Sequence, residues 1–170
     1  WEITRKIDYN WDTGPLRLLG KIAQEQGDLI RAREYFVTAV AQPPEVEGGW
    51  WLFSLMSLAD LERHQGHFAE ALRLLRDAIR RSREQFGYFL AIELLEELAY
   101  TQIIASRGRP GQEECLTWAA CCLGSAQASR EIVELNVLNF PTASHPEFIA
   151  ELHQRLDAPQ LRAAWTKGNS

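Results

Sequence analysis

Residues 19–39 read LGKIAQEQGDLIRAREYFVTA, and residues 58–78, which lie 39 positions later, read LADLERHQGHFAEALRLLRDA. Both stretches begin with leucine and a small residue, and both have glycine at the ninth position and alanine at the fourteenth and the last. Small residues at helical spacing on either side of a glycine turn indicate two closely packed helices. A third glycine, Gly108, follows at the same turn position. Repeats of this length predict a solenoid of helical hairpins, a fold class that mostly provides binding surfaces.

The repeated pattern resembles the tetratricopeptide repeat (TPR), in which a small residue in the first helix is followed by a glycine turn, two alanines flanking an aromatic residue, and a proline. We place the first repeat at residues 13–46, the second at 52–85 and a third at 88–134. The first repeat matches the pattern at Leu19, Gly20, Gly27, Asp28, Ala32, Phe36, Ala39 and Pro44. The second lacks the final proline, and the third is irregular because its alanine pair, Ala119-Ala120, comes late.

The resemblance implies an all-α fold, namely a TPR-like right-handed superhelix of three hairpins with C-terminal capping helices. Residues 1–12 are expected to be an N-terminal extension or the end of a truncated repeat, and residues 135–170 a loop followed by the capping helices. From the apolar spacing and the glycine and proline breaks, we expect helices at 13–26, 29–41, 50–65, 68–85, 88–106, 112–134, 147–156 and 159–165.

Composition argues against some classes of partner. The formal net charge is −5, so nothing indicates a general affinity for nucleic acid or for an anionic membrane. We expect neither a membrane span nor a signal peptide. The three cysteines, Cys115, Cys121 and Cys122, are odd in number and clustered, which favours a reduced, cytoplasmic setting with the thiols as small buried hydrophobes. No cofactor and no metal ion are expected.

A second resemblance covers residues 52–168. It is to the C-terminal sensor region of bacterial signalling ATPases and LuxR-type (MalT-like) transcriptional regulators, which are multidomain proteins. Four pieces agree in order and spacing: RGRP at 107–110, AACCLGSAQ at 119–127, HPEF at 145–148 and AAWTKG at 163–168. The segment 111–118 departs from the family pattern as an insertion, which puts the packing of the third hairpin in doubt.

The second resemblance implies a cytoplasmic module that senses a small molecule or a protein and relays the signal to an ATPase and a DNA-binding domain. This chain shows neither a phosphate-binding glycine-rich loop nor a helix-turn-helix of its own. It begins at Trp1 rather than at methionine, which would fit a piece of a longer protein.

TPR-like stacks hold their ligands in the concave groove, and the resemblance carries this role over to positions of this chain. The inner positions of the first two repeats are Arg17, Lys21, Gln24, Phe53, Met56, Asp60 and Arg63, and those of the third are Leu95, Leu98 and Gln102. Arg17 and Lys21 would bind a carboxylate, and Phe53 and Met56 an apolar side chain. The carboxylate clamp for chaperone tails needs basic residues on the third repeat, where this chain has apolar ones, so chaperone binding is not expected. The alternative is an ordinary solvated groove.

Signals for chemistry are weak. His64 and His67 flank Gly66, but a metal ion would need further ligands, and solvated residues at a turn are the alternative. Ser144 and His145 are adjacent, yet neither a nucleophile elbow nor an orienting acid accompanies them. We therefore predict that the chain is not an enzyme.

Two groups of residues leave alternatives open. Arg73, Arg76, Arg80 and Arg83 share one helical face, which would be either a docking patch for an acidic partner or nucleic acid, or a solvated face paired with glutamates 93, 96 and 97. The tryptophans at 50, 51 and 118 are either partner anchors or packing residues.

The sequence thus favours a non-enzymatic TPR interaction or sensor module of a larger bacterial signalling or transcriptional regulator, which binds a protein, a peptide or a small effector in its concave groove. The alternative is a stand-alone TPR scaffold that mediates protein–protein assembly. We expect a protein or peptide partner, keep a small-molecule effector as an option, and expect no direct contact with nucleic acid or membrane.

Overall fold

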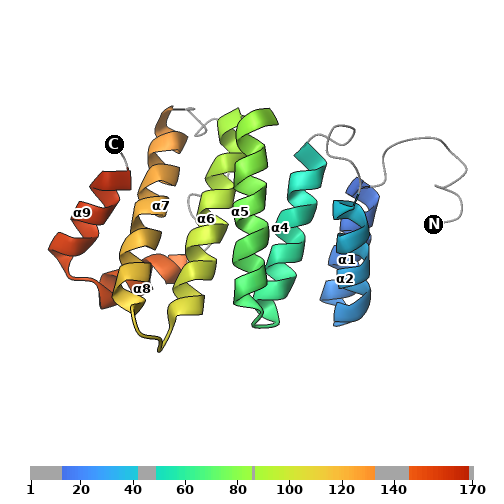
Figure 1. Cartoon of the computed structure of the whole chain (residues 1–170), viewed down its shortest axis with the longest axis horizontal. Coiled ribbons are helices and arrows are strands. Elements are labelled where there is room, and N and C mark those ends of the chain that lie inside the picture. The colour runs from blue at the N-terminus through green and yellow to red at the C-terminus, as the bar shows by residue number, and fades with distance from the viewer. Residues whose placement is uncertain (1–12, 42–48, 86, 133–145, 169–170) are drawn as a thin grey trace, which may run out of the picture. The chain divides into compact units, whose positions relative to one another are not determined.

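The computed structural model describes residues 13–41, 49–85, 87–132 and 146–168 (Figure 1). Helices and turns account for these residues, and no strand occurs among them, so the prediction of an all-α fold is confirmed. The chain divides into two compact units, residues 1–78 and 79–170. No helix in the described ranges is both long and apolar enough to cross a membrane.

The first unit holds two helical hairpins built on the repeated sequence. Its helices are α1 (Thr13–Glu25), α2 (Leu29–Val40), α4 (Gly49–His64) and the first part of α5 (Phe68–Gln85), of which residues 68–78 belong to this unit. Gly27 and Gly66 end α1 and α4 with φ angles of 79° and 80°, a left-handed conformation that favours glycine. In both turns, the N–H after the glycine donates to a carbonyl in the last helical turn, at 2.9 Å and 2.8 Å. The two halves of the repeat therefore end their first helix in the same way.

Close packing inside the first hairpin explains its small residues. Phe36 is 0% exposed, as are Ala32 and Ala39 on the same helix. A Cβ atom added to Gly20 of α1 would collide with the Phe36 ring, with Cδ1 only 2.6 Å away. Glycine at this position therefore lets the ring lie directly against the backbone of α1.

The second unit contains the hairpin of α6 (Gly87–Ser106) and α7 (Gln112–Ile132), followed by α8 (Pro146–Arg155) and α9 (Ala158–Gly168). Its core joins all four helices through Tyr100, Leu116, Ala120, Leu123, Phe148, Leu152 and Leu161. Helix α9 packs along α7 (Figure 1). A Cβ atom on Gly124 would collide with the Trp165 carbonyl, so this contact also depends on glycine.

An ion pair between α6 and α7 was not predicted; pairing of the α6 glutamates with the arginines of α5 was one of two alternatives that the sequence left open. Arg130 Nη2 lies 2.7 Å from each carboxylate oxygen of Glu96, in a largely buried pair. Arg73 of α5 pairs instead with Glu70 of its own helix, at 2.7 Å. The segment predicted to be an insertion includes the first turns of α7, where Leu116 enters the core.

The predicted helices are found with ends that differ by a few residues. The expectations for residues 1–12, for Ser144 with its neighbour His145, and for the last residues of the 112–134 helix lie outside the described residues.

Candidate functional site on the face of α1 and α4

Helices α1 and α4 pack against each other in the first unit, and this packing brings most of the predicted groove residues together. We call the surface formed by Arg17, Lys21, Gln24, Trp50, Phe53, Met56 and Asp60 the α1–α4 face. The α1 members recur at spacings of three and four residues, as do the α4 members from Trp50 to Asp60, so each set follows one side of its helix.

Asp60 joins the polar side chains of this face. Lys21 Nζ lies 3.6 Å from Asp60 Oδ2, and Gln24 Nε2 donates a hydrogen bond of 3.3 Å to the same oxygen. Arg63, one turn further along α4, donates from Nη2 to Asp60 Oδ1 at 2.6 Å. Lys21 and Arg63 therefore share one carboxylate, and the local charge balance is positive.

The same neighbours set the protonation state of Asp60. Burial alone would raise the pKa of this carboxyl group, but the charges of Arg63, His64 and Lys21 and the hydrogen bond from Gln24 outweigh it. The pKa of Asp60 therefore lies below its ordinary value of 3.8. The carboxylate stays ionised at neutral pH and holds the basic side chains in place.

Arg17 has a different environment. Its guanidinium carbon lies 5.8 Å from the ring centroids of both Trp50 and Phe53, at cation–π distance. The two rings are 5.9 Å apart, centroid to centroid, and tilted by 50°. A cation thus lies beside an aromatic pair at one end of the face, while the Asp60 cluster lies at the other.

Two buried polar atoms on α1 are unsatisfied among the described residues: Arg17 Nε and Gln24 Oε1 have no hydrogen-bond partner there. Unpaired buried polar atoms are uncommon in folded proteins, and each one calls for an explanation. A donor and an acceptor therefore flank Lys21, one towards each end of the α1–α4 face.

Of the other predicted residues, Met56 and Arg63 lie on α4 with the α1–α4 face, whereas Gln102 lies in the second unit. Met56 is half-buried and lies on α4 between Phe53 and Asp60. Arg63 is largely buried by its contacts. Gln102 belongs to the second unit, where its Nε2 donates to Cys115 Sγ at 3.1 Å, so its predicted role in a shared groove is not tested.

The adjacent tryptophans have different roles, which the sequence left open. Trp51 is 4% exposed and its indole N–H donates to the Val40 carbonyl at 2.8 Å, so it is a packing residue. Trp50 is 54% exposed and joins the α1–α4 face. Trp50 was not among the predicted groove residues, although its spacing of three from Phe53 was a usable signal.

The histidines next to the second turn have structural contacts. His64 Nδ1 lies 2.8 Å from the Asp60 carbonyl oxygen, and His67 Nδ1 lies 2.8 Å from a carboxylate oxygen of Glu62. Within the described ranges, no group of three or more histidine, cysteine or acidic side chains could hold a metal ion.

Burial raises the pKa of the Cys122 thiol to about 12, which leaves it protonated at neutral pH.

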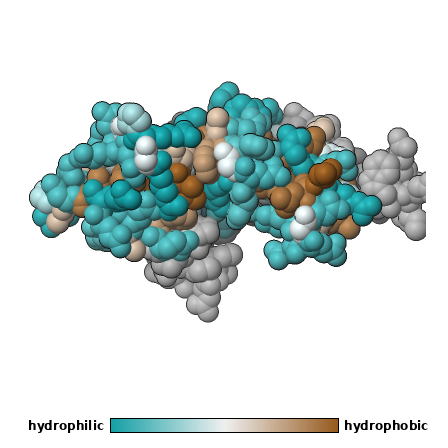
Figure 2. Space-filling view, turned by 90° about the horizontal axis from the view of Figure 1, so that it is seen from below, coloured by the Kyte–Doolittle hydropathy of each residue, from teal (hydrophilic) through white to brown (hydrophobic). Residues whose placement is uncertain are grey.

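Exposed apolar side chains also gather around the first hairpin, where Figure 2 shows brown surface among hydrophilic surface. They are Leu18, Leu19, Ile22, Leu29, Ile30 and Val37. The counterparts of Leu19 and Ile22 in the second repeat, Leu58 and Leu61, are buried. The two repeats therefore use the same positions differently.

Comparison with known proteins agrees with the helical repeat. No curated protein and no solved structure gives a significant match to this chain. The repeat fold is typical of protein–protein interaction modules without enzymatic activity. Residues 53–89, which include most of α4 and all of α5, match the tetratricopeptide repeat family model, so the chain has an all-α, TPR-like helical repeat fold.

Proposed function

We propose that the chain is a non-enzymatic interaction module whose α1–α4 face captures an extended peptide segment of a protein partner. The observation that supports this most directly is the environment of Arg17. Its guanidinium group lies against two aromatic rings, and its Nε has no hydrogen-bond partner among the described residues. A peptide carboxylate would pair with the positive charge of this guanidinium group.

The chemistry of the face defines the segment that fits it. Arg17 and Lys21 offer charge-assisted hydrogen bonds to an acidic side chain or a terminal carboxylate. The aromatic pair of Trp50 and Phe53, together with Met56, offers contact area to a neighbouring apolar side chain. The segment would thus carry an acidic residue beside an apolar one.

We further propose that this module is the cytoplasmic sensor part of a larger bacterial signalling or transcriptional regulator, with an array over residues 13–134 and a loop followed by capping helices over 135–170. The resemblance of residues 52–168 to that region of the LuxR-type regulators supports this part. Finding the chain as a complete gene product without an ATPase or DNA-binding domain would contradict it and favour the stand-alone scaffold.

Selection from a displayed random peptide library tests the peptide-binding proposal. The purified, unmodified chain is the only bait, so that the selection itself does not depend on Arg17. The affinity of the best peptides is then measured by fluorescence anisotropy. We expect enrichment of sequences with an acidic residue next to an apolar one, and a loss of at least about tenfold in affinity on Arg17→Ala, because a hydrogen bond to a charged group contributes about 1.5–3 kcal/mol.

Arg31→Gln is the matched control, because Arg31 is an exposed cation of the same unit that lies 3.7 Å from Asp28 on the neighbouring turn. Its affinity should stay within about twofold of the unmodified chain, as expected for a surface pair. Selected peptides without an acidic residue, or equal losses in the two variants, would contradict the assignment of the α1–α4 face.

A further inference from the structure

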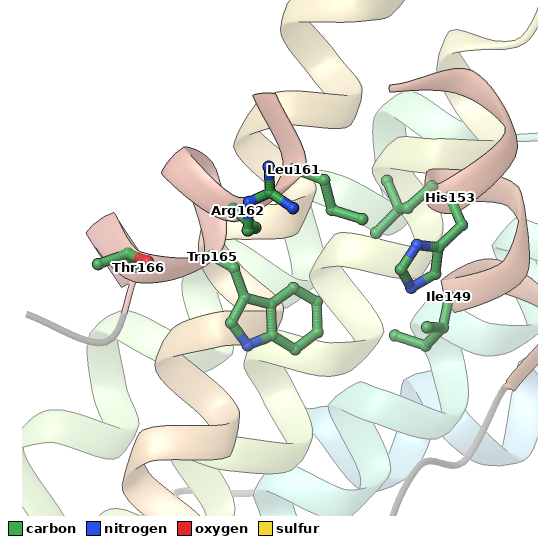
Figure 3. A pocket seen from close by; sticks show the side chains of 7 residues that line it. Ile149, His153, Leu161, Arg162, Trp165 and Thr166 are labelled. Carbon is green, nitrogen blue, oxygen red and sulfur yellow. The ribbon is translucent and has the colours of Figure 1, made fainter. Parts of the chain in front are cut away.

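A pocket of about 380 Å³ lies between α8 and α9 in the second unit (Figure 3). Its volume falls in the range of about 300–1,000 Å³ that is usual for small-molecule sites. None of its lining residues belongs to the α1–α4 face, and none of them was predicted from the sequence to form a site. The pocket is therefore a separate candidate.

The pocket has a fixed apolar wall. Leu152 of α8 and Leu161 of α9 are buried members of the core, and Ile149 and Trp165 pack against it. The indole N–H of Trp165 donates to Gln127 Oε1 of α7 at 3.1 Å, which holds the ring in orientation. A flat apolar group would find a preformed surface of matching shape beside this ring.

The polar groups of the pocket are basic. Arg162 of α9 and His153 of α8 line it, and both are exposed. Among the described residues, neither side chain has an ion-pair or hydrogen-bond partner, whereas Arg107 of the same unit is held by Glu151 at 2.6 Å. Figure 3 shows the His153 and Trp165 rings on opposite sides of the space. A guanidinium group without an acid partner next to an apolar wall is complementary to an amphipathic anion.

We propose that this pocket binds a small molecule that combines a flat apolar body with one carboxylate. The body lies against Trp165 and Leu161, and the carboxylate accepts hydrogen bonds from Arg162. On the opposite side of the pocket, His153 offers an imidazole nitrogen to the ligand. The site is independent of the peptide-binding face, so either proposal can fail without the other.

Fluorine NMR of the chain labelled with 5-fluorotryptophan tests the proposal at a single residue. The Trp165→Phe variant identifies the Trp165 signal, and the probes are 2-naphthoate and its uncharged analogue 2-naphthylmethanol. We expect a saturable shift of the Trp165 signal with 2-naphthoate, and binding of the alcohol that is weaker by about tenfold, as expected when a charge-assisted hydrogen bond is lost.

Two variants and one control separate charge from shape. Arg162→Gln should remove the preference for the carboxylate, whereas Arg155→Gln, which removes one exposed positive charge of α8 outside the pocket, should retain it. Ile149→Trp should fill the space and block both probes. Equal affinity for the two probes would overturn the anion specificity, and shifts confined to tryptophans other than Trp165 would overturn the pocket itself.

Discussion

Replacing Gly20 by alanine is the sharpest test of the close packing in the first hairpin. The new Cβ atom would lie 2.6 Å from Phe36 Cδ1 and 2.9 Å from Cζ, distances that real side chains do not reach. Phe36 is fully buried, so its ring has little room to move away. Overpacking a tight core costs about 1–3 kcal/mol, while alanine in place of glycine gains about 1 kcal/mol of helix propensity. We expect a net loss in the free energy of unfolding of about 1 kcal/mol, taking an overpacking cost near 2 kcal/mol.

The second repeat suggests how to reverse the loss, because it has Ala59 and Leu75 where the first has Gly20 and Phe36. Phe36→Leu alone should cost on the order of 1 kcal/mol. In the double variant the clash is gone and the helix propensity is retained, so its stability should be close to that of the unmodified chain. The expected coupling is about 2 kcal/mol, within the range of residues in direct contact.

Urea unfolding followed by far-UV circular dichroism measures the four free energies of this cycle. Hydrogen exchange of the α1 and α2 amides, measured by mass spectrometry, locates the change in the first hairpin. Additivity of the two substitutions within about 0.5 kcal/mol would refute the contact between the ring and the α1 backbone. Stabilisation by the single Gly20→Ala substitution would refute it as well, because only helix propensity would then be acting.

The repeat offers a second comparison at one shared position, occupied by Ile22 and Leu61. Leu61→Ala should lower the free energy of unfolding by about 2–5 kcal/mol because this side chain is 0% exposed, whereas Ile22→Ala, at 53% exposure, should change it by less than about 0.5 kcal/mol. Similar values for the two variants in urea unfolding would contradict the difference in packing. The lowered pKa of Asp60 makes its stabilising contribution complete above the ordinary value of 3.8, and this contribution is lost as the pH falls through the lower folded-state value. Asp60→Asn should therefore reduce the fall in melting temperature on acidification below about pH 4, and an unchanged slope would show that Lys21 and Arg63 do not stabilise the ionised form.

Local features of the sequence predicted the hairpins well, because their causes lie within a few residues. The positive φ of Gly27 and Gly66 and the buried Ala32 follow from short-range steric rules that the repeat displays twice. The helix between residues 112 and 132 was predicted although its sequence departs from the repeat pattern. In each case, backbone geometry and side-chain size decide the outcome.

Contacts between helices were harder to predict, because they depend on which side of a helix faces the core. Arg130 of α7 pairs with Glu96 of α6 over a sequence separation of 34 residues, and nothing in the spacing of either residue indicates the other. The α8–α9 pocket was not predicted for the same reason, since Trp165 and Ile149 line it from separate helices. Sequence periodicity predicts which side of each helix is buried, but it does not predict which other helix packs against that side.

The α4 helix shows why the candidate site was only partly predicted. Seven of its first ten residues are large and apolar, so periodicity alone permits either side to face the core. Trp51, Leu52, Leu55 and Leu58 are among the residues that turn inward, whereas Trp50 and Phe53 lie on the side that carries Asp60. That choice leaves an exposed indole beside Arg17, a combination that packing within the described residues does not require. The α1–α4 face therefore differs from the buried stripe, because its aromatic and charged side chains are not needed for the core. Its residues are the first to substitute in a search for the partner.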